Sequence, residues 1–150
     1  MATTVAPGIE NLTLNITEEI LVRSSLETAF AALLEQMGPA NTGHEGSPLP
    51  MVLEPWPGGR WFRDLGDKNG HLWGHVQAIK RPTLLEITGP LMISSAVVSN
   101  VQYRLKQVDG GTLITLKHSA LGVMPDGYRQ GLGQGWKQML EGIRRRTEGA

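Results

Sequence analysis

Alternation of hydrophobic and polar residues along most of the chain predicts β-strands. Leu12, Leu14 and Ile16 alternate with polar neighbours and predict a first strand over residues 12–22, with a bulge at Glu18-Glu19. Similar runs, divided by turns rich in Gly, Pro, Asn and Asp, predict strands at 51–53, 60–64, 70–79, 84–88, 96–108 and 112–119. Strands that follow one another through hairpins form an antiparallel sheet.

Two segments repeat apolar residues at helical spacing instead. Ser24 is predicted to cap the first helix, which runs to about Met37, and Glu27 completes a capping box three residues later. The second helix follows Pro125-Asp126, and its apolar stripe is Tyr128, Leu132, Trp136, Met139, Leu140 and Ile143. Because several glycines weaken this second helix, packing on the sheet must hold it in place.

This order of elements predicts a single α+β domain over residues 12–147, after a flexible lead-in over residues 1–11. We expect a curved antiparallel sheet of about six or seven strands, wrapped around the long C-terminal helix, with a shorter helix after the first strand. Such an arrangement can leave a cavity between the sheet and the helix.

The composition narrows the classes of function. The 150 residues include 14 basic and 14 acidic side chains, so no broad attraction to nucleic acid or to an anionic membrane is expected. No apolar segment is long enough to span a bilayer, and no signal peptide is visible. The chain has no Cys, which excludes disulfides and Cys-based zinc sites. These features predict a soluble, cytoplasmic protein.

Neither a metal nor a cofactor is expected. His71 and His75 lie on one predicted strand, where residues four apart are roughly 13 Å from each other, too far to share a metal ion. The glycines at 131, 133 and 135 lack the following Lys and Ser or Thr of a phosphate-binding loop. No GxSxG motif indicates a hydrolase nucleophile.

Several short motifs, in their order, resemble the SRPBCC superfamily, whose START and birch-pollen-allergen members share the helix-grip fold. The motifs are residues 20–34, Pro57-Gly58-Gly59-Arg60, Gly74-His75-Val76 with Pro82 and Leu85, residues 111–118, and Gly135-Trp136 followed by Leu140. The nearest likeness is the branch named after activators of heat-shock-protein ATPase, which includes many uncharacterised bacterial proteins. Residues 41–47 depart from the pattern, because they lack the Trp-rich second helix of many members. This leaves open how the cavity is covered.

The resemblance implies a ligand cavity of the helix-grip kind, and the aromatic residues are the natural candidates to line it. Residues 54–75 hold three of the four Trp and one of the two Phe. The predicted ligand-binding set is Phe30, Trp56, Trp61, Phe62, Tyr103, His118, Tyr128, Trp136 and Leu140. The resemblance also favours Leu72, Gly74 and Val76 as an inward-facing set, which leaves Trp73 and His75 facing outward or at an edge.

His118 is the candidate for chemistry. It shares a strand phase with Ile114 and Leu116, so it should face the helix and the cavity. There it could hydrogen-bond a ligand or act as a general base, and the alternative is a core histidine bonded to a neighbour. Glu54, Arg60, Arg63 and Asp64 flank the Trp-rich run, where surface ion pairs are favoured over acid–base chemistry.

Three functions remain open at this stage. The first is binding of a small hydrophobic or aromatic molecule between the sheet and the last helix. The second is a cyclase- or hydrolase-type enzyme that uses the same cavity. The third is a co-chaperone-like interaction domain, which would show an exposed apolar patch. A homodimer is a further alternative, and a chaperone partner is the less favoured one.

Overall fold

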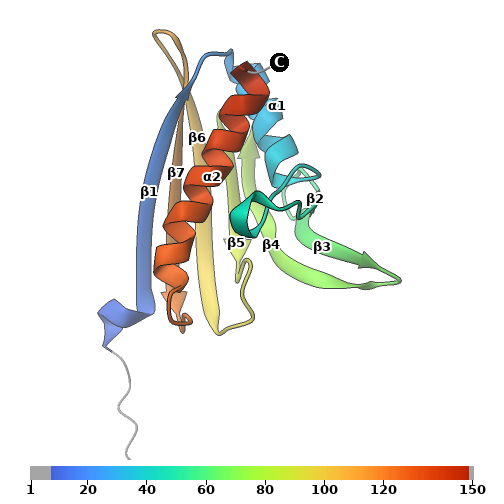
Figure 1. Cartoon of the computed structure of the whole chain (residues 1–150), viewed down its shortest axis with the longest axis vertical. Helices are drawn as coiled ribbons and strands as arrows, with labels where there is room; N and C mark the ends of the chain where they lie inside the picture. Colours follow the sequence, from blue (N-terminus) through green and yellow to red (C-terminus); the bar gives the residue numbers. More distant parts are fainter. Residues whose placement is uncertain (1–7, 149–150) are drawn as a thin grey trace, which may run out of the picture.

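The strands form one antiparallel sheet with the order β1-β7-β6-β5-β4-β3-β2 in the computed structural model, which describes residues 8–148 (Figure 1). The strands are β1 (Thr13–Val22), β2 (Val52–Leu53), β3 (Arg60–Gly66), β4 (Asn69–Lys80), β5 (Leu84–Gly89), β6 (Val97–Val108) and β7 (Gly111–Gly122). The helices are α1 (Leu26–Met37) and α2 (Tyr128–Glu148), and two short 3-10 helices are η1 (Ile9–Leu12) and η2 (His44–Gly46).

The sheet curves around α2, and α1 packs beside α2 on the same side of the sheet (Figure 1). The predicted α+β architecture is therefore confirmed, including the shorter helix after the first strand. The core between the layers holds fully buried side chains from both of them, among them Leu33, Tyr103, Leu116 and Ile143. No helix among residues 8–148 is long and apolar enough to cross a membrane.

Two local predictions near the N-terminus are wrong. β1 pairs with β7 without a register shift, so there is no bulge at Glu18-Glu19, and Glu18 takes the same face as Ile16 and Ile20. The cap of α1 is Ser25, whose hydroxyl accepts the Thr28 N–H at 3.2 Å. Ser24 lies one residue too early, and its carbonyl instead accepts the Thr112 hydroxyl at 2.8 Å.

Only residues 8–11 of the predicted lead-in fall within the part of the chain that the structure describes, because residues 1–7 lie outside it. The 3-10 helix η1 begins at Ile9 and ends at Leu12. The Arg129 guanidinium at the start of α2 donates to the carbonyl of Asn11 at 2.8 Å, which ties η1 to the helix.

A bulge in β4 changes which side chains face inward. Trp61 pairs with Gly74 whereas Phe62 pairs with Leu72, so Trp73 is the extra residue on its strand. As a result Trp73 and Val76 are both buried, whereas Leu72 is exposed. The prediction that Leu72 faces inward and Trp73 outward is thus wrong, because the bulge reverses the side-chain alternation at this point.

Gly74 is needed where the bulge meets the next strand. A Cβ at this position would lie 2.5 Å from the carbonyl oxygen of Thr88 in β5, closer than side-chain carbons approach backbone oxygens. The close backbone contact explains why a glycine stands in the predicted Gly-His-Val motif.

Candidate functional site

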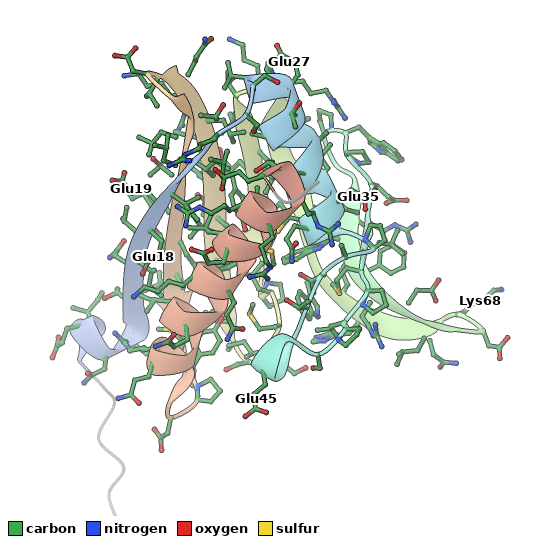
Figure 2. All side chains as sticks on the ribbon, turned by 45° about the horizontal axis from the view of Figure 1, so that its top comes forward. Glu18, Glu19, Glu27, Glu35, Glu45 and Lys68 are labelled. Atoms are coloured by element: carbon green, nitrogen blue, oxygen red, sulfur yellow. The ribbon has the colours of Figure 1, made fainter. Side chains whose placement is uncertain are left out.

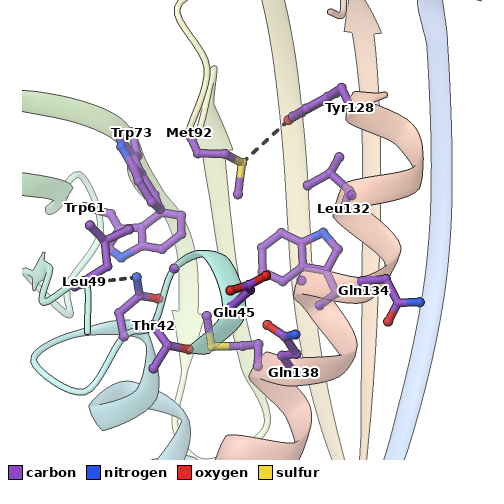
Figure 3. A pocket seen from close by; sticks show the side chains of 16 residues that line it. Thr42, Glu45, Leu49, Trp61, Trp73, Met92, Tyr128, Leu132, Gln134 and Gln138 are labelled. Carbon is purple, nitrogen blue, oxygen red and sulfur yellow. Dashed lines mark hydrogen bonds between the residues drawn. The ribbon is translucent and has the colours of Figure 1, made fainter. Parts of the chain in front are cut away.

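A cleft of about 670 Å³ lies where α2 begins, next to β3 and β4 (Figure 3). Its lining combines three parts of the chain: the indoles of the sheet, one face of α2, and the segment between α1 and β2. The lining residues are Asn41, Thr42, Gly43, Glu45, Leu49, Trp61, Trp73, Met92, Tyr128, Gly131, Leu132, Gln134, Gly135, Trp136, Gln138 and Met139.

Trp61 and Trp73 form the wall on the side of the sheet. Their rings meet edge to face with centroids 4.9 Å apart, a favourable arrangement for aromatic pairs. The Trp61 indole N–H donates to the carbonyl of Met37 at 2.7 Å, at the C-terminal end of α1. The Trp73 indole N–H donates to Nδ1 of His71 at 3.1 Å. Both polar edges are therefore bonded within the protein.

The first half of α2 forms the opposite wall. Tyr128, Leu132 and Trp136 recur every four residues and so share a face of the helix. Gly131 and Gly135 also line the cleft, and a Cβ at either would meet no atom within 4 Å. These glycines leave open space that side chains would otherwise occupy. Burial raises the pKa of Tyr128 to about 12, so its hydroxyl is protonated at neutral pH.

The segment between α1 and β2 closes the third side. Two hydrogen bonds hold its base: the Asn41 side-chain amide donates to the Leu49 carbonyl at 3.0 Å, and the Leu49 N–H donates to the Asn41 carbonyl at 2.9 Å. Between them η2 places Glu45 at the cleft, with its backbone in the left-handed region at φ 54°. This segment takes the position that the sequence left open, although it has no Trp.

His118 lies under the helix and outside the cleft lining. Its side chain is 0% exposed, and both ring nitrogens are bonded. The Trp136 indole N–H donates to Nδ1 at 2.9 Å, so in the neutral ring Nε2 carries the proton and donates to the Ser99 hydroxyl at 3.0 Å. Burial lowers the pKa of His118 to about 4. This geometry is that of a neutral core histidine that orients Trp136.

The other predicted site residues divide between the cleft, the core and the surface. Trp61, Tyr128 and Trp136 line the cleft. Phe30, Tyr103 and Leu140 are buried in the core and do not line it, and the Tyr103 hydroxyl donates to the sulfur of Met37 at 3.3 Å.

Trp56 and Phe62 lie away from the cleft. Trp56 is 55% exposed in the loop between β2 and β3. Phe62 stacks under the Arg60 guanidinium, 4.5 Å from the ring centroid. The Glu54 carboxylate accepts two hydrogen bonds from that guanidinium at 2.7 and 2.9 Å, and these bonds lower the pKa of Glu54 to about 2. This group therefore forms a surface ion pair that ties the β2–β3 loop.

Sequence reasoning missed the segment 41–49, Met92 and the glycines as parts of the cleft wall. The glycines carried a usable signal, because three of them at alternate positions just before Trp136 are unusual within a helix. The segment 41–49 carried none, since its wall is built by turns and a 3-10 helix. Among the described residues, no group of three or more His, Asp or Glu side chains could hold a metal ion.

Comparison with known proteins agrees with this architecture. Residues 25–148 match the family model described as Activator of Hsp90 ATPase homolog 1-like protein. An uncharacterized protein from Rhizobium leguminosarum superposes with a TM-score of 0.70 at 16% identity, over 92% of this chain and 96% of that one. Ara h 8.0201 superposes with a TM-score of 0.68 at 14% identity, over 92% and 99%.

One further neighbour is larger than this chain. The di-domain ARO/CYC StfQ from the steffimycin biosynthetic pathway superposes with a TM-score of 0.67 at 12% identity, over 94% of this chain but 53% of that one. This chain thus spans about half of that protein. At these identities the likeness concerns the fold alone. No curated protein sequence matches this chain.

Proposed function

The chain belongs to the Activator of Hsp90 ATPase homolog 1-like protein family, and from that premise we propose that it binds a small hydrophobic or aromatic molecule in the cleft beside α2. The observation that supports this proposal most directly is the cleft itself. Its volume of about 670 Å³ lies within the range of small-molecule sites, and three indoles and a phenol line it. Aromatic side chains that border a cleft gain favourable contacts when a flat apolar molecule packs against them.

The test is a titration with a panel of flat hydrophobic compounds, followed by tryptophan fluorescence. Three of the four Trp residues line the cleft, and Trp56 lies outside it. Trp56→Phe should therefore keep the ligand-dependent quenching while removing background emission. If no compound changes the emission or the melting temperature, the proposal is wrong.

A matched pair of variants locates the site. Gly135 lines the cleft and Gly133 does not, yet a Cβ at either meets no atom within 4 Å. Gly135→Leu should fill the cleft and weaken binding by about tenfold or more, whereas Gly133→Leu should leave affinity unchanged. Both variants gain helix propensity, so loss of folding would not explain a difference. Equal binding by both would place the ligand elsewhere.

An enzymatic role in the same cleft would have to use other groups than His118. The ionisable side chains that line the cleft, among those the structure describes, are Glu45 and Tyr128. His118 has no free nitrogen for proton transfer, since Ser99 and Trp136 occupy both. For an activity found in this protein, His118→Ala should act through stability, and Glu45→Gln should lower the turnover rate itself.

The interaction-domain alternative is supported by a different surface. The β2–β3–β4 arm carries four exposed apolar side chains, Val52, Trp56, Leu65 and Leu72. If this arm contacts a chaperone, Leu65→Ser with Leu72→Ser should abolish co-purification of the chaperone and leave the binding of small molecules intact. Recovery of the same chaperone by both proteins would argue against this surface.

A further inference from the structure

The hydrogen-bond donors of the aromatic walls are already used within the protein. The indole N–H groups of Trp61, Trp73 and Trp136 are all bonded within the protein, to Met37, His71 and His118. The Tyr128 hydroxyl is directed at the sulfur of Met92 at 3.7 Å. The aromatic walls therefore present ring faces and few free N–H or O–H donors to a ligand.

Acceptors are provided by the segment between α1 and β2. Asn41 is 2% exposed and lines the cleft, and its Oδ1 has no hydrogen-bond partner among the described residues, while its amide nitrogen is bonded to Leu49. A buried acceptor without a donor is uncommon in folded proteins. It is suited to a ligand that brings an N–H or O–H donor.

The charge at the cleft has one sign. Among the described side chains that line it, Glu45 carries the only charge, and no Lys or Arg lines it. Figure 3 shows Trp61 and Trp73 on one side of the cleft, Tyr128 and Leu132 on the other, and Glu45 between them in the view. Glu45 is exposed on η2, well away from Glu27 and Glu35 of α1 (Figure 2). It therefore lies at the mouth of the cleft and not in its interior.

These observations point to one class of ligand, and the assignment rests on the proposed binding function. We infer that the cleft takes an organic cation with a flat apolar body and a protonated amine. The body would lie between the indoles and α2, and the ammonium would remain at the mouth, near Glu45. The free acceptor of Asn41 belongs to the buried part of the lining. Aromatic faces attract cations through the negative potential over their rings, and a carboxylate adds a direct charge interaction. An anion of the same shape would meet repulsion from Glu45.

The experiment compares three probes of one shape by isothermal titration calorimetry. They are 2-naphthylmethylamine, which is a cation at neutral pH, 2-naphthylmethanol, which is neutral, and 2-naphthoate, which is an anion. At low salt the amine should bind about 5- to 10-fold more tightly than the alcohol, and the carboxylate most weakly. Because Glu45 is exposed, 0.5 M salt should reduce the preference for the amine to roughly twofold.

Two variants assign the preference to a residue. Glu45→Gln removes the carboxylate from the mouth of the cleft and should lower the ratio of amine affinity to alcohol affinity to roughly twofold. Glu35→Gln removes the same charge from an exposed position outside the cleft. It should keep the full ratio of amine affinity to alcohol affinity.

The outcomes separate this inference from the proposed function. Equal affinity for the three probes, or tighter binding of the alcohol or carboxylate, would overturn the inference and leave small-molecule binding intact. A preference that survives in Glu45→Gln would overturn the role of that carboxylate. Absence of binding by all three probes would overturn both proposals.

Discussion

The two halves of α2 use glycine in opposite ways. In the first half, Gly131 and Gly135 face open space and help to form the cleft. In the second half, a Cβ at Gly142 would lie 2.6 Å from the side-chain amide of Gln36, so this glycine lets α1 and α2 approach each other closely. One helix therefore borders the cleft at one end and packs closely against α1 at the other.

Side chains reinforce the closed end. The Arg144 guanidinium donates to the carbonyl of Leu21 at 3.2 Å, and the Glu148 carboxylate accepts the Arg23 N–H at 3.1 Å, both at the end of β1. Arg146 donates to Gln36 of α1 at 3.1 Å. The open half has a looser attachment, through Arg129 to η1. The cleft and the closely packed contacts thus lie in different halves of the helix, so stability should respond differently to mutation in each half.

The largest test of this contrast is truncation of one side chain in each half. Ile143 is fully buried in the closed half, so Ile143→Ala should lower the free energy of unfolding by about 3–4 kcal/mol. Tyr128 is only partly buried beside the cleft, and Tyr128→Ala should cost about 1 kcal/mol. Urea unfolding measures both values. Similar losses in the two variants would contradict the division of the helix.

The pH dependence of the unfolding free energy tests the boundary between the two halves of α2, where Trp136 bonds to His118. The folded-state pKa of His118 is about 4, below the ordinary value of 6.5, so the unfolded chain binds more protons between these values. The free energy of unfolding should therefore be highest above pH 6.5, where His118 is neutral in both the folded and the unfolded chain. It should decline by about 3 kcal/mol in total as the pH falls toward 4.

Glu54 does not obscure this window, because its pKa is lowered from 4.5 to about 2 and its contribution declines only below pH 4.5. The control is His118→Gln, which keeps hydrogen-bonding capacity but cannot titrate. Its unfolding free energy should vary less between pH 6.5 and 4.5 than that of the wild type. Parallel pH profiles would refute the neutral, buried state of His118.

The smallest effects concern the glycines themselves. Gly142→Leu should destabilise the fold by about 1–2 kcal/mol, because the new side chain must displace Gln36 from its bonds to Arg146 and Ala40. Gly133→Leu should instead stabilise it by about 0.5–1 kcal/mol through helix propensity, since no atom lies within 4 Å of the added Cβ. Thermal unfolding of the two variants provides the comparison. Shifts of the same sign would show that the halves are packed alike.

Local patterns in the sequence determine most of the architecture. Strand alternation, turn residues and the stripe from Tyr128 to Ile143 depend on neighbours a few positions apart, so the sequence predicted the antiparallel sheet and the covering helix. They also predicted that His118 faces the helix, and its ring does bond to Trp136.

Which residues line the cleft was decided only by the tertiary structure. The bulge that turns Trp73 inward depends on how β3 pairs with β4, and periodicity within β4 alone cannot reveal it. The cleft position of Glu45 depends on the bonds that close the segment between Asn41 and Leu49. The role of each glycine in α2 depends on what lies opposite it, which is open space at 131 and 135 and Gln36 at 142. Such relations join residues far apart in the chain, and only the folded arrangement of the strands and helices establishes them.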